Sequence, residues 1–127
     1  MPLVRINLQA GRTPDAKGAI ADAVQDALVS VIGIPMEDRF AMVHEYPGAD
    51  FTHSKGFFGC LYTNQLLMIE ITFIEGRSDQ MKKLLLQDIH DRLVATGQVG
   101  GDDIFVCIHE VAPANISFGK GLAQRTL

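Results

Sequence analysis

The chain has few cysteines, no excess of positive charge and no long apolar run, and each shortage argues against a class of protein. The net charge of −4 disfavours nucleic-acid binding, because phosphate contacts usually require a basic face. No stretch is long and apolar enough to span a bilayer. Cys60 and Cys107 match no metal-ligand spacing, so we expect reduced, packed thiols and no metal site.

What is present fits one globular domain over residues 1–127, with 47% hydrophobic and 20% charged residues. Residues 1–5 lack the basic region and apolar run of a signal peptide. We therefore expect a soluble cytoplasmic protein.

The chain contains an internal repeat. Residues 3–45 align without gaps on residues 68–110, and 11 of the 43 positions are identical, roughly four times what chance gives. The matches cluster in Gly11-Arg12 with Gly76-Arg77 and in the pair His-Glu at 44–45 and 109–110. Outside the repeat lie a long connection, residues 46–66, and a Gly-rich tail, residues 111–127, in which we expect a turn at residues 118–121.

Each copy has the pattern of a β-α-β unit. An alternating strand comes first, then a glycine turn, and Thr13 or Ser78 in an N-cap position. Apolar residues at helical spacing follow, up to Gly33 and Gly97. In the second copy they are Met81, Leu84, Leu85, Ile89, Leu93 and Val94. The second strands are expected at 40–45 and 105–110, parallel to the first because a helical crossover joins them.

We expect an α/β (α+β) fold in which the two first strands pair antiparallel. This gives a four-stranded mixed sheet with both helices on one face. The other face should carry mainly apolar residues and two histidines, with three more polar residues among them: Leu3, Met42, His44, Met68, Cys107 and His109, together with Arg5, Asn7 and Glu70. Because such a face is too apolar for open water, we expect other subunits to cover it.

This topology brings three distant residues to one edge of the sheet. Pro2 starts the first strand, Asp38 precedes the strand parallel to it, and Arg77 follows the antiparallel third strand. The opposite edge has Arg12 and Asp103, but a mid-chain Leu67 in place of Pro2. Only the first edge can hold a free terminal amine.

Pro2 becomes that amine if the initiator methionine is removed. Burial and a nearby cation lower the pKa of an amine, which could then take a proton beside a carbonyl as a general base. Arg77 suits a carboxylate, or is a surface arginine. Asp38 could orient water or substrate, or be a turn carboxylate.

Other charged residues are weaker candidates. His44 and His109 occupy equivalent strand positions, so they are expected to be packed or interface histidines rather than catalytic groups. Arg12 and Arg39 are less favoured ligands.

These residues resemble a known family. The segment Ile74-Glu75-Gly76-Arg77-Ser78-Asp79-Gln80 is similar to the strand-to-helix turn of 4-oxalocrotonate tautomerase, and Pro2 completes the tautomerase superfamily pattern. Nearly the whole chain resembles the malonate semialdehyde decarboxylase-like fused members, through residues 37–40, 43–45 and 117–124.

The resemblance implies a homotrimer and a set of site residues. The family's terminal proline falls on Pro2 and its aspartate on Asp38. Of two family arginines, one falls on Arg77, whereas Glu75 stands in place of the other. A tail aromatic falls on Ile116, with Phe118 nearby, and Arg39 is an additional candidate for substrate binding.

The sequence therefore leaves three functions open. The first is a tautomerase of small 2-oxo acids that uses Pro2 as base, Arg77 as carboxylate ligand and Asp38 to tune the site, without metal or organic cofactor. The second is a decarboxylase or hydratase with Pro2 as a protonated acid and Asp38 activating water. The third is a non-catalytic binding trimer on the same fold.

Overall fold

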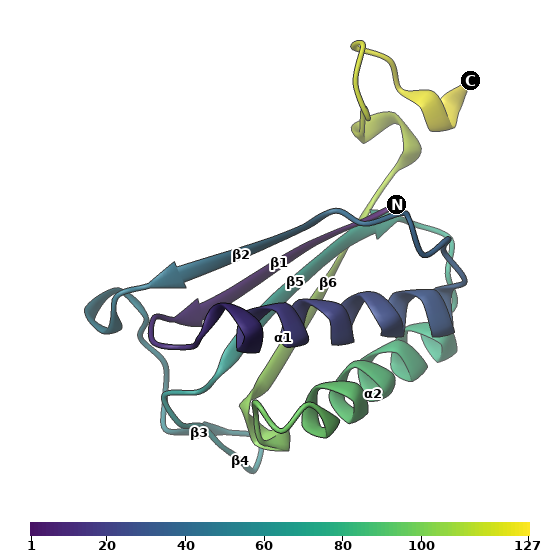
Figure 1. Cartoon of the computed structure of the whole chain (residues 1–127). Coiled ribbons are helices and arrows are strands. Elements are labelled where there is room, and N and C mark those ends of the chain that lie inside the picture. Colours follow the sequence, from purple (N-terminus) through teal and green to yellow (C-terminus); the bar gives the residue numbers. More distant parts are fainter.

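The computed structural model describes all residues 1–127 and shows two layers, a sheet and a pair of helices. The strands are β1 (Pro2–Gln9), β2 (Ala41–Tyr46), β5 (Leu67–Ile74) and β6 (Ile104–Val111). Helix α1 is Pro14–Ala27, continued by a π-helical turn, Leu28–Ile32, and α2 is Asp79–Ala95. Both helices cover the same face of the sheet (Figure 1).

The expected topology is confirmed. The strand order is β2-β1-β5-β6, with β1 antiparallel to β5 and each outer strand parallel to its neighbour. The long connection carries a small hairpin, β3 (Gly56–Phe57) with β4 (Cys60–Leu61).

Two pairs of equivalent positions in the two copies make the same local contacts. Thr13 and Ser78 each accept a hydrogen bond, of 3.1 Å, from the backbone N–H three residues on, which satisfies one otherwise unpaired donor of each helix. Lys17 bonds Glu45 at 2.6 Å, and the equivalent Lys82 bonds Glu110 at 2.8 Å. The repeated residues thus cap the helices and tie each helix start to its second strand.

The core lies between the sheet and the helices. Alternate residues of β1 and β5 point into it, including Ile6, Leu8, Ile71 and Phe73, all fully buried. The sequence expectation for α2 is only partly correct: Leu85 is buried, but Leu84 and Val94 lie on the exposed side. Both follow a helical spacing, yet the sheet contacts only one narrow stripe of α2.

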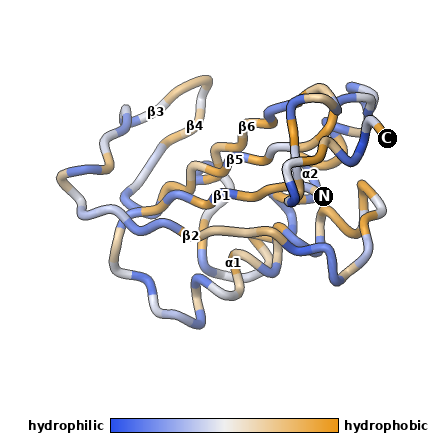
Figure 2. Tube along the Cα trace, turned by 90° about the horizontal axis from the view of Figure 1, so that it is seen from above, coloured by the Kyte–Doolittle hydropathy of each residue, from blue (hydrophilic) through white to orange (hydrophobic).

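The opposite face of the sheet is open in the single chain. Figure 2 looks onto this side of the sheet from above, and no helix lies over the strands there. Leu3 and Met42 are partly exposed there. Cys107 is exposed as well, so the expectation that both cysteines are packed is wrong for Cys107 in a single chain; Cys60 is half-buried.

The tail leaves the sheet after β6 and forms a separate arm. In both views it rises beside the amino terminus (Figures 1 and 2). Bends and turns at residues 118–121 agree with the expected glycine turn. The arm ends in a short 3-10 helix, Gln124–Thr126.

Candidate active site at the amino terminus

The amino terminus lies where two hollows meet. The larger hollow, about 520 Å³, is lined by Met1, the apolar side chains Leu3, Phe40, Ile116 and Phe118, and the polar groups of Asp38, Ser117 and Arg125. The smaller hollow, about 270 Å³, is polar and is lined by Met1, Ile74, Glu75, Arg77 and Arg125. Met1 and Arg125 therefore form the boundary between an apolar half and a charged half.

Pro2 is buried beneath this boundary as the first residue of β1, opposite Phe73 of β5. The Met1 side chain is only 10% exposed, and its amino nitrogen is 3.9 Å from a carboxylate oxygen of Asp38. While Met1 is attached, its side chain fills the junction and the Pro2 nitrogen is an amide.

The surroundings of the amino terminus favour an uncharged amine. Burial lowers the pKa of the Met1 amino group, and the cations Arg125 and Arg77 lower it further. The Asp38 carboxylate acts in the opposite direction but does not cancel the effect.

Asp38 is free to face this hollow because its backbone is held elsewhere. The buried Gln25 side chain donates to the Asp38 carbonyl at 2.9 Å and to the Met36 carbonyl at 3.4 Å. The Asp38 carboxylate is 42% exposed, and its one polar contact is with the amino terminus. Gln25 had been overlooked in the sequence, although it is the polar residue within the apolar stripe of α1.

Arg77 reaches the polar hollow from the turn after β5. Its guanidinium donates to the Ile74 carbonyl at 3.2 Å and lies 4.8 Å above the ring centre of Phe73. Gly76 has φ of +126°, a conformation that glycine tolerates best, and this turn directs the arginine back toward the sheet edge.

The opposite edge carries the duplicate residues but no hollow around them. Asp103 is 5% exposed and accepts hydrogen bonds from the backbone N–H of Thr63 at 2.8 Å and from the Thr63 hydroxyl. Arg12 donates to the Gln65 carbonyl at 2.6 Å, and Leu67 is fully buried. The connection thus seals this edge, so the two aspartates have different surroundings.

The remaining candidates are placed as follows. Glu75 lines the polar hollow, and Ile116 and Phe118 line the apolar one. Arg39 lines neither, because its guanidinium bonds Asp22 at 2.6 Å. Arg125 was missed in the sequence, because the tail lies outside the repeat and no local pattern places it.

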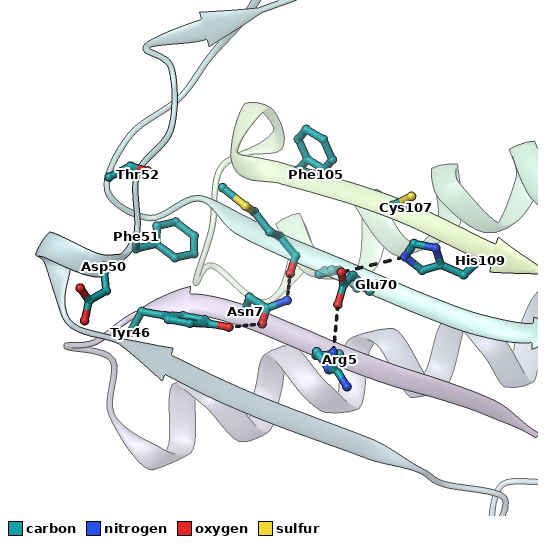
Figure 3. A pocket seen from close by; sticks show the side chains of 12 residues that line it. Arg5, Asn7, Tyr46, Asp50, Phe51, Thr52, Glu70, Phe105, Cys107 and His109 are labelled. Atoms are coloured by element: carbon teal, nitrogen blue, oxygen red, sulfur yellow. Dashed lines mark hydrogen bonds and ion pairs between the residues drawn. The ribbon is translucent and has the colours of Figure 1, made fainter.

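A further hollow of about 450 Å³ lies on the open face of the sheet, toward its other end (Figure 3). Its polar groups satisfy one another: the Tyr46 hydroxyl donates to Asn7 at 3.0 Å, and Asn7 donates to the Met68 carbonyl at 3.0 Å. Glu70 lies 3.7 Å from Arg5 and 4.0 Å from His109. This hollow belongs to the uncovered face and not to the amino terminus.

Neither helix is long and apolar enough to cross a membrane. The chain also gathers no group of three His, Cys, Asp or Glu side chains that could hold a metal ion.

The sheet consists of two β-α-β units, and the amino terminus lies in a hollow at one edge. This is the arrangement of the tautomerase fold, and sequence comparison agrees with that class. Family models described as "Tautomerase enzyme" match residues 38–119 and residues 2–53. The chain belongs to the tautomerase family.

Individual relatives span the full length. "Probable tautomerase YusQ" of Bacillus subtilis (strain 168) is 26% identical over 124 residues, covering 98% of each chain. The solved FG41 malonate semialdehyde decarboxylase, inhibited by 3-bromopropiolate, is 35% identical with a TM-score of 0.88, covering 98% of this chain and 94% of that one. A fused 4-OT, solved as a symmetric trimer, is 26% identical with a TM-score of 0.79, covering 98% of each chain.

Proposed function

We propose that this protein is a tautomerase of small 2-oxo acids in which Pro2, freed by removal of Met1, is the general base. One observation carries the proposal: the start of β1 lies at the junction of an apolar and a polar hollow, with the Asp38 carboxylate and the guanidinium groups of Arg77 and Arg125 facing the amino terminus. No other edge of the sheet offers this combination.

The reaction follows from these positions. The Pro2 nitrogen takes a proton from the carbon next to the 2-oxo group, and the C–H electron pair becomes the C=C bond of the enolate. The protonated Pro2 then gives this proton, through water, to the former carbonyl oxygen, which completes the enol and restores the free amine. In the reverse direction the protonated Pro2 returns its proton to that carbon. Arg77 binds the substrate carboxylate, and Asp38 at the rim steadies the protonated amine.

The surroundings suit this role because the base must be unprotonated near neutral pH. Burial and the two guanidinium groups lower the pKa of the Met1 amino group against the opposing effect of Asp38, and we expect the same surroundings to lower the pKa of a free Pro2 amine. Removing Met1 also vacates the space its side chain fills, so the same step frees the base and opens the site.

The test compares two prolines in protein whose native terminus has been checked by mass spectrometry. Pro2→Ala should lower kcat/KM for phenylpyruvate tautomerisation at least about tenfold, since the secondary amine is replaced by a primary one. Pro14→Ala, at the start of α1, changes the same residue type outside the site and should leave kcat/KM near the native value. Equal activity of Pro2→Ala and native protein would contradict the mechanism.

The 35% identity to the FG41 decarboxylase favours a second candidate, decarboxylation or hydration of a substrate such as malonate semialdehyde. There Pro2 would be protonated and Asp38 would activate water. A pH–rate profile separates the two, because activity rises as Pro2 loses its proton in the base mechanism and falls in the acid mechanism. The third candidate, a binding trimer, is favoured if mass spectrometry finds Met1 attached in the cell, because Pro2 is then an amide and cannot be the base.

We further propose that the open sheet face packs against other copies in a homotrimer. The solved fused 4-OT is a trimer, and the face exposes Leu3, Met42, Phe105 and Cys107 in one chain. Light scattering after size exclusion should give three times the chain mass, and a monomer at micromolar concentration would contradict this assembly.

A further inference from the structure

Two arginines at the site make no ion pair, whereas three of the other four do. Arg5, Arg39 and Arg92 are ion-paired with Glu70, Asp22 and Asp88. Arg12 bonds the Gln65 carbonyl and is close enough to Asp103 for that carboxylate to affect its pKa. Arg77 and Arg125 make no ion pair, and both line the polar hollow beside the amino terminus.

The position of Arg125 is set by contacts within the tail. The Gln124 side chain accepts from the Phe118 backbone N–H at 3.0 Å and donates to the Gly119 carbonyl at 2.9 Å. This clasp fixes the 3-10 helix that carries Arg125 against the turn that carries Phe118. The tail therefore places the cation Arg125 and the apolar side chain of Phe118 beside the amino terminus as one unit.

We propose that Arg125 and Arg77 bind the substrate carboxylate from two sides, and that the apolar arm of the substrate lies along Phe40 and Phe118. This inference rests on the proposed tautomerase function. It assigns the preferred substrates as 2-oxo monocarboxylic acids with an aryl or alkyl substituent. Arg125 thereby contributes, from the tail, a second cation to a hollow that also contains the carboxylate side chain of Glu75.

The balance of charge excludes a second carboxylate. Arg77 and Arg125 offset Glu75 and Asp38, so the lining is neutral when the amine is unprotonated. One bound carboxylate gives a single negative charge. The second carboxylate of a dicarboxylic acid would lie in the apolar hollow, among Leu3, Phe40 and Phe118 and near Asp38, where desolvation and repulsion both oppose it.

The test compares Arg125→Gln with Lys120→Gln. Both remove one positive charge from the tail, but Lys120 lines neither hollow. For phenylpyruvate, Arg125→Gln should lower kcat/KM about ten- to hundredfold, the usual effect of losing a hydrogen bond to a charged group, whereas Lys120→Gln should leave it unchanged. Arg77→Gln should have an effect of similar size. The native protein should prefer phenylpyruvate to 2-hydroxymuconate, a dicarboxylate.

A methyl ester separates carboxylate binding from a structural role. The loss caused by Arg125→Gln should disappear with methyl phenylpyruvate, because the ester offers no anion to bind. Equal losses on acid and ester would overturn the assignment, as would unchanged kcat/KM for the acid.

Binding is also measured without turnover. Calorimetry with 3-phenylpropionate, which has no 2-oxo group, should show that Arg125→Gln binds this ligand at least about tenfold more weakly than native protein does. If native protein lacks activity but shows this difference, the proposed reaction fails and the arginine pair stands. If activity is present but Arg125→Gln binds 3-phenylpropionate like native protein, the arginine pair fails and the reaction stands.

Discussion

Substitutions at the two equivalent aspartates should affect different properties, namely stability at Asp103 and activity at Asp38. Asp103 is 5% exposed and accepts from both the backbone N–H and the hydroxyl of Thr63, whereas the Asp38 side chain is 42% exposed and contacts only the amino terminus. We predict that Asp103→Ala destabilises the fold and that Asp38→Ala impairs the site and leaves the fold intact.

The magnitude follows from the hydrogen bonds lost. A hydrogen bond to a charged group contributes about 1.5–3 kcal/mol to stability. Asp103→Ala removes two such bonds and water compensates for part of the loss, so the unfolding free energy should fall by about 2–4 kcal/mol. Asp103→Asn keeps one acceptor for the Thr63 N–H but loses the charge opposite Arg12, and should cost about half as much.

Urea denaturation at one fixed protein concentration measures the difference, since an oligomer's midpoint depends on concentration. With a slope of about 2 kcal/mol per molar urea, the Asp103→Ala midpoint should fall by about 1–2 M. The Asp38→Ala midpoint should stay within about 0.3 M of native, because its side chain makes no hydrogen bond within the fold. Equal midpoints for the two alanine variants would refute the division of roles.

Two further predictions concern the amino terminus. Because burial, Arg125 and Arg77 lower the pKa of the terminal amine, kcat/KM should rise with pH through that pKa and then level off. Arg77→Gln removes a cation and raises the amine pKa, so the midpoint of a spectrophotometric pH–rate profile should move to higher pH. A midpoint that moves to lower pH would contradict this prediction. Gln25→Ala releases the Met36 and Asp38 carbonyls and should lower kcat for phenylpyruvate several-fold while costing about 1–2 kcal/mol in urea unfolding; a stability loss with unchanged kcat would make Gln25 purely structural.

Much of the fold is readable from the sequence because it depends on local chemistry. The period of two in β1 and β5 is the pattern of strands with one face on the core, and Thr13 and Ser78 in fact cap the helices. Alignment of the two copies also indicated antiparallel pairing of the first strands, and hence the edge shared by Pro2, Asp38 and Arg77.

The same alignment could not tell which copy of a shared residue is structural. Asp38 and Asp103 occupy equivalent positions, each two residues before an identical phenylalanine, but the connection seals the Asp103 edge through Thr63 and leaves the Asp38 edge open. That difference arises from the path of residues 46–66, which have no counterpart in the repeat. Helical spacing likewise left undecided whether Leu84 and Val94 pack, because the contact stripe depends on how α2 lies on the sheet.

Local pattern alone thus determined the strands, the helices and their caps, since each of these depends on residues a few positions apart. Alignment of the two copies with each other indicated the two-fold plan. Only the tertiary structure decided that Gln25 holds the backbone at Asp38 and that Met1 fills the junction of the two hollows. It alone also decided that Arg125, from the far end of the chain, lines the same hollow as Arg77. These contacts join segments up to a whole chain length apart, and no periodicity records where a tail comes to rest.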